Sequence, residues 1–360
     1  MKKTPFYDIH RKHGAKIVEF AGFEMPIQYE GIIAEHKKVR NSVGVFDVTH
    51  MGEIEISGEA ALEFIQKITT NDASKLEEGK VQYSAMCYPD GGIVDDLLVY
   101  HCGSYYMLVV NASNKDKDFN WMLENKLDGV KIEDKSDEFA LLAVQGPDSL
   151  KTIQKLTDVD LSEIKYYHFV KGKIAGVDAI ISRTGYTGEL GFELYFKWDD
   201  TIAEEVWNAL FDAGKEFGIA PIGLGARDTL RLEMGMCLYG NDIDNTTNPL
   251  EAGLGWITKL DKPGFNAKDV LVKLKSDGLK RKLVGFIIQD KAFPRHNYEI
   301  FANGKKIGFV TSGTYSPILN YSIGMGYVEK EYSAEGSQID IMIRNKPVKA
   351  TVTKPPFIKK

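Results

Sequence analysis

The chain has 360 residues, a length that suits two or three domains better than one core. Its hydrophobic content of 43% and charged content of 27% are ordinary for a globular protein, and its net charge of −6 leaves no basic footprint for nucleic acid. No apolar run approaches the roughly 18 residues that span a bilayer, and the basic N-terminus lacks the apolar segment of a secretory signal. The three cysteines have no CxxC spacing, which argues against a zinc site or a disulfide framework and favours a reducing compartment. We therefore expect a cytoplasmic protein that binds neither nucleic acid nor a membrane.

Strand patterns outnumber helical ones along the chain. Runs rich in β-branched and aromatic residues predict strands over 15–20, 52–57, 82–87, 92–100, 105–110, 139–144, 173–183, 191–196, 283–289, 306–311, 323–329 and 337–353. Apolar residues at helical spacing predict helices over 30–41, 58–68, 115–127, 147–156, 199–217, 226–235 and 266–275.

Short turns join many of these strands, as at Gly103 between the strands 92–100 and 105–110. Hairpins with interspersed helices indicate an α+β fold with antiparallel sheets rather than a parallel doubly wound sheet. The polar segment 275–282 is the best candidate linker, and the strand-rich tail after it predicts a small all-β domain.

Two acids interrupt the apolar strand in GGIVDDLLVYHCG, residues 91–103. Strand side chains alternate between faces, so Asp95 and Asp96 point in opposite directions and cannot form a dyad. The preceding Gly91-Gly92 predicts a turn that another backbone or a ligand can approach closely. Asp95 favours a structural role, whereas Asp96 shares its face with Tyr100 and suits a pocket at least equally well.

A second segment, SRTGYTGELGFELYF, spans 182–196 and has a glycine at every third position. It matches neither a P-loop nor a GxGxxG fingerprint, so a phosphate cradle is a poor interpretation and a flexible hairpin loop is the plain alternative. Glu193 lies on one strand face with Gly191 and Tyr195. That placement is typical of a ligand surface and almost equally of a buried salt bridge.

A third segment, PIGLGARDTLRLEMG, spans 221–235 and predicts a helix with two arginines one turn apart. Asp228 can pair with Arg231 at i,i+3. Arg227 then needs another anion, which is Glu193, Glu233 or a carboxylate on a ligand, and the pattern does not choose between them.

The segments above belong to a longer ordered set that resembles one protein family. In chain order the set comprises GAKIVEFAGFEMPIQY, SVGVFDVTHMGE, TNDASKL, VQYSAMCYPDGGIVDDLLVY, LVVNASN, AVQGP, SRTGYTGELGFEL, GLGARDTLRLEMGMCLYGNDID, KLVGF, TSGTYSPILNYSIGMGYV and KPPF. The chain closely resembles the T-protein family of the glycine cleavage system, the tetrahydrofolate-dependent aminomethyltransferases. The match runs from the first residues to the last.

The resemblance implies three domains in a clover-leaf around a central folate channel, with a β-barrel-like C-terminal domain. Carried onto this chain, residues 1–52 and 140–255 form a split folate-binding domain, 53–139 an inserted α+β domain, 256–282 a linker and 283–360 the barrel-like domain.

The resemblance also implies a reaction. Such enzymes take an aminomethyl group from the dihydrolipoyl arm of lipoylated H-protein and yield ammonia and 5,10-methylenetetrahydrofolate. They are linked in function to P-protein and L-protein. Tetrahydrofolate is a co-substrate, and neither a metal nor a flavin is required.

The family's site residues map onto matching motifs here, with Asp96 in GGIVDD as the catalytic acid. Asp96 also counts among the expected folate-contacting residues. The other folate-lining positions are Met51, Tyr83, Tyr100, Asn111, Tyr167, Tyr186, Glu193, Arg227 and Trp256.

Two other interpretations remain open. A free-standing folate-dependent demethylase would share the channel but act on small methylated compounds. A folate-sensing or iron–sulfur assembly protein on the same scaffold can dispense with the catalytic acid. The retained acid in GGIVDD and arginine in GARD favour the enzyme.

Overall fold

The computed structural model describes residues 1–290 and 292–359. These residues divide into two compact units. The first unit comprises Met1–Phe64, Ala73–Gln82 and Leu97–Asp228. The second comprises Ile65–Asp72, Tyr83–Asp96 and the C-terminal part from Thr229.

The helices are short, and most carry one apolar stripe. They are α1 (Tyr7–Lys12), α2 (Ile32–Asn41), α3 (Ala61–Ile68), α4 (Lys115–Glu124), α5 (Ser149–Gln154), α6 (Asp200–Ala213), α7 (Leu224–Glu233) and α8 (Lys268–Asp277). Single turns of 3-10 helix occur at Ala73–Lys75, Ala112–Asn114, Ser136–Glu138, Leu161–Glu163, Lys215–Phe217, Gly255–Ile257 and Lys330–Tyr332.

Two sheets lie wholly within the first unit. Its six-stranded sheet has the order β10 (Phe169–Ile174), β11 (Val177–Ser182), β12 (Gly191–Lys197), β9 (Phe139–Gln145), β3 (Gly44–Asp47) and β13 (Ala220–Pro221). All neighbours pair antiparallel except β13, which pairs parallel with β3. A separate hairpin joins β1 (Lys16–Phe20) and β2 (Phe23–Gln28).

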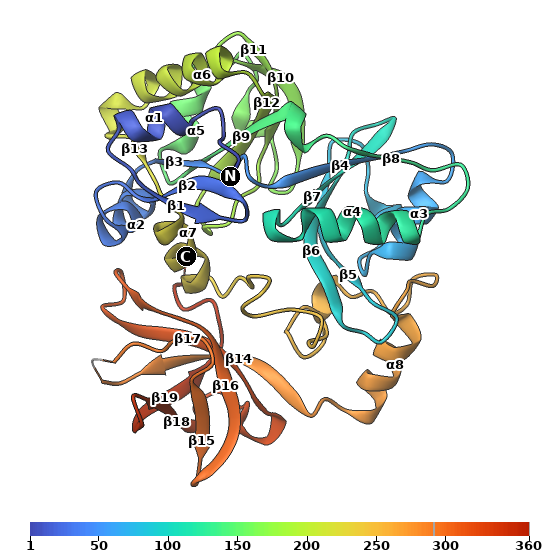
Figure 1. Cartoon of the computed structure of the whole chain (residues 1–360), viewed down its shortest axis with the longest axis vertical. Coiled ribbons are helices and arrows are strands. Elements are labelled where there is room, and N and C mark those ends of the chain that lie inside the picture. The colour runs from blue at the N-terminus through green and yellow to red at the C-terminus, as the bar shows by residue number, and fades with distance from the viewer. Residues whose placement is uncertain (291, 360) are drawn as a thin grey trace. The chain divides into compact units, whose positions relative to one another are not determined.

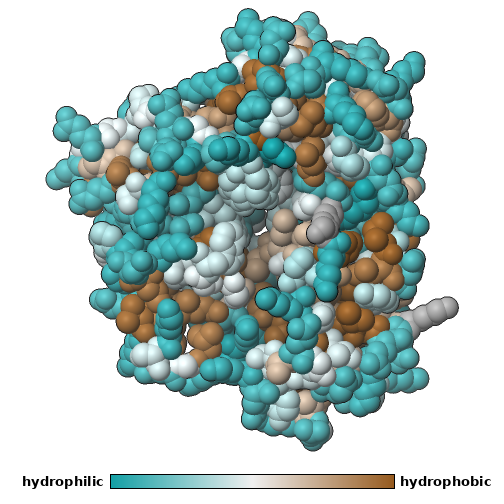
Figure 2. All heavy atoms as spheres, turned by 180° about the vertical axis from the view of Figure 1, so that it is seen from behind, coloured by the Kyte–Doolittle hydropathy of each residue, from teal (hydrophilic) through white to brown (hydrophobic). Residues whose placement is uncertain are grey.

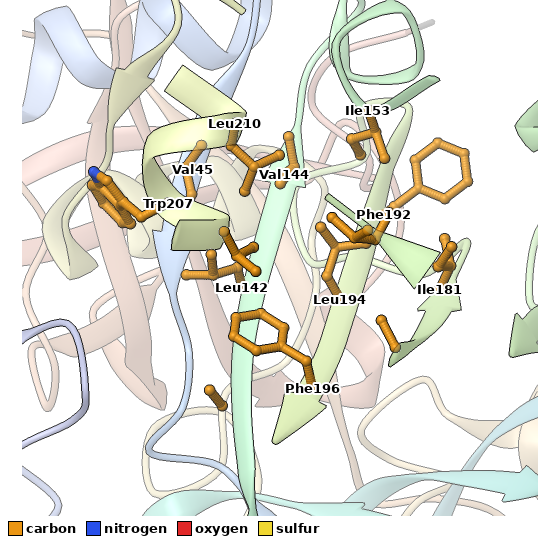
Figure 3. Packing of buried hydrophobic residues seen from close by; sticks show 14 of the residues in the cluster. Val45, Leu142, Val144, Ile153, Ile181, Phe192, Leu194, Phe196, Trp207 and Leu210 are labelled. Atoms are coloured by element: carbon orange, nitrogen blue, oxygen red, sulfur yellow. The ribbon is translucent and has the colours of Figure 1, made fainter. Parts of the chain in front are cut away.

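The core of the first unit lies between the six-stranded sheet and helix α6. Figure 3 shows Trp207 and Leu210 of α6 beside Val45, Leu142 and Val144 of the sheet, all of them almost fully buried. The helix begins where the Asp199 side chain accepts hydrogen bonds from the backbone N–H groups of the first turn, at 2.9 and 3.1 Å. Burial of large side chains at helical spacing therefore fixes α6 on the sheet.

A five-stranded sheet has the order β5 (Val81–Cys87), β6 (Ile93–His101), β7 (Tyr105–Val110), β4 (Gly52–Ser57) and β8 (Lys131–Asp134). The division between the two units falls within β5 and within β6. β6 and β7 pair antiparallel across the turn at Gly103, whose φ is +88°. The predicted hairpin at this position is confirmed.

The C-terminal strands of the second unit close into a barrel, drawn in orange to red in Figure 1. Around the barrel the strands are β14 (Arg281–Ile288), β17 (Tyr321–Glu329), β16 (Lys305–Ser316), β15 (Glu299–Ala302), β18 (Gln338–Ile343) and β19 (Lys346–Thr353). Apolar side chains such as Phe286, Val310 and Ile341 fill its interior. The predicted α+β class and C-terminal barrel are confirmed, and the clover-leaf around a channel stays a prediction.

Two predicted strands are wrong because each is in fact a hairpin. The segment predicted as one strand over 173–183 turns at Ala175 and Gly176, where φ is +50° and +84°. The segment predicted over 337–353 turns at Arg344 and Asn345, where φ is +51° and +63°. Positive φ at two successive residues allows a two-residue turn whose twist matches that of the two strands it joins.

A buried lysine binds backbone carbonyls of the segment 65–72 in the second unit. Lys262 is 3% exposed, and its Nζ donates to the backbone oxygens of Gln66 (2.8 Å), Thr69 (2.6 Å) and Asn71 (2.8 Å). These carbonyls lie at and just beyond the end of α3, where a helix leaves its last carbonyls without partners. The ammonium therefore caps a helix end that is shut away from water.

On the face in Figure 2, hydrophilic residues predominate and hydrophobic ones form separate patches. Within residues 1–290 and 292–359, no helix has the length and apolar character needed to cross a membrane. Of the large apolar side chains, Trp256 is the most exposed after the terminal Met1, at 61%.

Candidate functional site

The predicted site residues fall into two groups, one in each unit. Asp96, Tyr83 and Trp256 belong to the second unit. The first unit holds the other predicted residues, Met51, Tyr100, Asn111, Tyr167, Tyr186, Glu193 and Arg227.

The start of strand β6 is pinned by a loop that packs against its two glycines. The N–H of Ile93 donates to the carbonyls of Asp244 (3.1 Å) and Thr247 (3.0 Å). A Cβ on Gly92 would lie 2.2 Å from the carbonyl oxygen of Asn245, so only glycine lets the loop come this close. The close backbone approach expected at Gly91-Gly92 is confirmed, and it fixes the strand just before its two acids.

The two acids on β6 differ in burial as alternation predicts. Asp95 is fully buried, whereas Asp96 is only half-buried. Asp96 Oδ2 accepts a hydrogen bond of 2.8 Å from the Tyr83 hydroxyl on β5. Asp96 is thus the acid of the two that a ligand can reach, and one of its oxygens is held in place.

Tyr83 also links Asp96 to an exposed aromatic ring. The Tyr83 ring centroid lies 5.8 Å from that of Trp256, with the planes tilted by 40°. Trp256 itself is 61% exposed. The second unit therefore presents a carboxylate bonded to one aromatic side chain, which in turn contacts a second aromatic side chain that is open to solvent.

Cys237 of this unit is buried and interacts electrostatically with Asp96. Burial raises the pKa of the Cys237 thiol well above its ordinary value, and the charges of Asp242 and Asp96 raise it further. A thiol in this environment stays protonated at neutral pH. Chemistry at Asp96 must therefore proceed without a protein thiolate from Cys237.

In the first unit, Tyr100 is the centre of a buried network of hydroxyl groups. Its Oη lies 3.1 Å from Ser182 Oγ, 3.3 Å from Thr184 Oγ1 and 3.0 Å from Tyr195 Oη. Burial raises the pKa of the Tyr100 phenol. The network joins strand β6 to β11 and β12, so the predicted position of Tyr100 is built by two different sheets.

Glu193 lies at the edge of this hydroxyl network. On β12 it pairs with Ser182 of β11 and Ala143 of β9, and its carboxylate accepts a short hydrogen bond from Thr184. Burial raises the pKa of the Glu193 carboxyl, while the bond from Thr184 and the charge of Arg227 oppose that change. Because this carboxylate is already buried, it can accept hydrogen bonds from a ligand's N–H groups at little extra desolvation cost.

Arg227 lies against an aromatic ring in the first unit. Its Cζ is 4.7 Å from the ring centroid of Tyr186, a cation–π contact. Burial lowers the pKa of His50 to about 4, and the charge of Arg227 helps to lower it.

The carboxylate of Glu233, one anion expected for Arg227, accepts a hydrogen bond from Ser316. Arg231 forms its own buried ion pair with Asp242, at 2.5 Å.

Tyr167 has an unusual backbone conformation. Its φ is +59°, a region that bulky residues avoid. Backbone hydrogen bonds to Arg183 (3.1 Å) and from Val81 (2.8 Å) hold it there, and its ring meets that of Tyr166 edge-on. Burial raises the pKa of the Tyr167 phenol, and the charges of Tyr166 and Glu193 raise it further, so Tyr167 and Glu193 are electrostatic neighbours. Strain of this kind concentrates at functional sites.

The remaining two predicted residues lie at turns of the first unit. Met51 is half-buried, and its N–H donates to the carbonyl of Val48. Asn111 follows β7, and its carbonyl accepts from the N–H of Asn114 at 2.9 Å.

The glycines of the segment 182–196 serve a packing purpose. A Cβ on Gly185 or Gly191 would lie 2.1 or 2.4 Å from the side chain of Gln145. Gln145 in turn accepts from Thr187 Oγ1 at 2.9 Å and donates to the carbonyl of Thr184 at 3.2 Å. The loop is therefore closed over a buried amide, which fixes it in place beside Glu193.

The sequence patterns missed several polar residues of the first unit, namely Ser182, Thr184, Tyr195, His50 and Glu53. The first three are scattered over β11, β12 and the loop between them, and only the pairing of the strands brings them together. His50 and Glu53 flank Met51 in THMGE, so proximity to a predicted residue was the one available signal.

Two models of known families match the chain. The GCVT N-terminal domain matches residues 6–262, and the glycine cleavage T-protein C-terminal barrel domain matches residues 281–359.

Curated relatives match over their whole length. An aminomethyltransferase of Halothermothrix orenii is 54% identical over 99% of this chain and 100% of its own. One from Bacteroides fragilis is 56% identical over 100% of both chains. Among solved structures, the glycine cleavage system aminomethyltransferase T from Bartonella henselae matches with a TM-score of 0.92 and 32% identity, over 99% of this chain and 98% of that chain.

Proposed function

This chain belongs to the glycine cleavage T-protein family of aminomethyltransferases, and from that premise we propose that it transfers a one-carbon group to tetrahydrofolate. Its donor is the aminomethyl group carried on the dihydrolipoyl arm of H-protein. The C–S bond to the arm breaks and leaves a thiol, the C–N bond breaks and releases ammonia, and the carbon ends as a methylene bridge between N5 and N10 of folate. P-protein and L-protein complete the cycle as functional partners.

The observation that carries this proposal is the carboxylate of Asp96. As the aminomethyl group leaves sulfur, the carbon and nitrogen acquire positive charge, and a fixed carboxylate stabilises that charge. By analogy with an oxyanion-hole donor, such a group contributes about 3–4 kcal/mol. The hydrogen bond of 2.8 Å from Tyr83 keeps Asp96 oriented before the substrates arrive.

The residues of the first unit suit a reduced pterin. Its aminopyrimidine ring carries adjacent N–H groups, and the buried carboxylate of Glu193 is the acceptor for them. Tyr186, Tyr100 and Tyr167 supply flat surfaces for the ring. Burial raises the pKa of the Glu193 carboxyl, and the charge of Arg227 opposes that rise and so favours the ionised form. Folate brings the nucleophilic nitrogen, and the protein provides position and charge.

The positions of Met51, Asn111 and Trp256 complete the proposed folate-lining set. Trp256 is exposed beside Tyr83, which suits contact with a ligand that enters from solvent. We also retain the proposed domain division. In its support, the six-stranded sheet uses strands before residue 52 and after residue 138, and the five-stranded sheet uses strands between them.

The decisive experiment compares donors. The purified protein is incubated with tetrahydrofolate and either aminomethyl-loaded H-protein or small methylated amines, sulfonium compounds and aryl ethers. We expect folate-dependent ammonia release from the H-protein donor and no turnover of the others. Demethylation of a small donor without ammonia release from H-protein would establish the demethylase alternative, and folate binding without any turnover would establish a binding protein.

A further inference from the structure

A second glutamate of the first unit is buried with no side-chain partner. Glu53 on β4 is 1% exposed, and within the described part of the chain neither carboxyl oxygen has a hydrogen-bond partner. Its backbone is fully used, because its N–H donates to Ser136 Oγ (3.0 Å) and its carbonyl accepts from Lys135 (2.8 Å). Nearly all buried polar atoms in folded proteins are bonded, so a carboxyl group left in this state costs stability.

The surroundings of Glu53 connect it to the group around Glu193. Burial raises the pKa of the Glu53 carboxyl well above its ordinary value, and the negative charges of Asp134 and Glu193 raise it further. Lys115 opposes this change but is itself bonded to Asp134 at 2.7 Å. Glu53 also adds to the raised pKa of the Tyr195 phenol, which belongs to the hydroxyl network. Burial and the neighbouring negative charges therefore favour the protonated form of the Glu53 carboxyl group, whereas Arg227 and the hydrogen bond from Thr184 favour the ionised form of Glu193.

The two protonation states of a carboxyl group are complementary in hydrogen bonding. An ionised carboxylate only accepts, whereas a carboxylic acid donates through O–H and accepts through C=O. The pyrimidine edge of a pterin presents both kinds of group, because its ring N–H and amino group donate while its carbonyl and free ring nitrogen accept. A site with one carboxylate and one carboxylic acid can satisfy donors and acceptors of the same ring.

We propose that Glu53 is a further substrate-binding group, which hydrogen-bonds together with Glu193 to the pterin ring of folate. This inference rests on the function proposed above. The substrate then supplies the hydrogen-bond partners that the Glu53 carboxyl group lacks. Folate binding offsets the stability lost by burying that group unbonded.

A purely structural glutamate would behave differently on substitution. Replacement of a buried, unbonded carboxyl group by an apolar side chain of similar length removes the desolvation cost and raises stability. If the group also binds folate, the same substitution weakens affinity. A gain in stability together with a loss of affinity is a signature that a structural role does not produce.

The experiment measures two quantities on each variant: the unfolding midpoint without ligand, and the Kd for tetrahydrofolate. We expect E53M to unfold at or above the wild-type midpoint and to bind folate at least tenfold more weakly. We expect E53Q to stay within threefold of the wild-type Kd, because an amide also carries one donor and one acceptor side. E55M is the matched control, since Glu55 lies two residues along the same strand face and is half-buried, and its Kd should be unchanged.

Each outcome decides the proposal. Wild-type affinity in E53M, or a folding failure in both E53M and E53L, shows that Glu53 is structural and overturns the inference. Tenfold weaker binding in E55M as well would assign the effect to the strand and not to Glu53. If the wild-type protein itself does not bind tetrahydrofolate, the proposed function fails, which is a separate and recognisable result.

Discussion

The hydroxyl of Tyr83 can be removed without disturbing its ring. Y83F deletes the 2.8 Å hydrogen bond to Asp96 and keeps the aromatic contact with Trp256 at 5.8 Å. A hydrogen bond to a charged group contributes about 1.5–3 kcal/mol, and the partial exposure of Asp96 places this one near the lower value. If the bond serves to orient Asp96, loss of about 1.5 kcal/mol reduces turnover roughly tenfold.

A double-mutant cycle tests whether Tyr83 acts through Asp96. Ammonia release at saturating folate and loaded H-protein is measured for the wild type, Y83F, D96N and the double variant. We expect Y83F to lower turnover about tenfold in the wild type and less than about twofold in the D96N background. Y315F, which removes a barrel hydroxyl 3.4 Å from Asn320, is the control and should be silent. An equal tenfold loss in both backgrounds would refute the orienting role.

Three further predictions concern stability. K262M removes the ammonium that donates to three backbone carbonyls, two of them in buried hydrogen bonds, and should lower the free energy of unfolding by about 3 kcal/mol, measured by urea titration, whereas K273M on the exposed face of α8 should change it little. The pKa of His50 is about 4 in the fold and near 6.5 when unfolded, so the unfolded chain binds the extra proton first as pH falls. The free energy of unfolding should therefore fall by about 3 kcal/mol between pH 6.5 and 4. H50L should flatten that part of the plot of unfolding free energy against pH. An unchanged slope in H50L would contradict a neutral buried imidazole. G92A, whose Cβ meets the Asn245 carbonyl at 2.2 Å, should cost about 1–3 kcal/mol, while G264A, with no atom within 4 Å, should be neutral.

The fold class could be predicted from the sequence because each helix or strand depends mainly on the pattern of residues within its own segment. The strand over 52–57 and the helix predicted over 58–68, which the structure has at Ala61–Ile68, follow directly from the spacing of apolar residues. The two missed hairpins show the limit of that reasoning. Gly176 was a usable turn signal, but the turn at Arg344 and Asn345 puts an arginine at positive φ, which residue preference alone disfavours.

The site was harder to predict because its geometry depends on partners that are distant in sequence. The different burial of Asp95 and Asp96 follows from alternation, but the hydroxyl that holds Asp96 comes from another strand. Glu53 is a second example. The pattern GEIEIS does not distinguish Glu53, which is buried, from Glu55, which lies on the same strand face and is half-buried. No pattern within a single strand contains that information.

The central claim concerns the carboxylate of Asp96, and single-turnover ammonia release from aminomethyl-loaded H-protein tests it most directly. D96N should fold, bind tetrahydrofolate with wild-type affinity and release ammonia about 100- to 1,000-fold more slowly. D95N, which alters the buried neighbour, should lose stability more than rate. Near-normal ammonia release by a folded, folate-bound D96N would contradict the account.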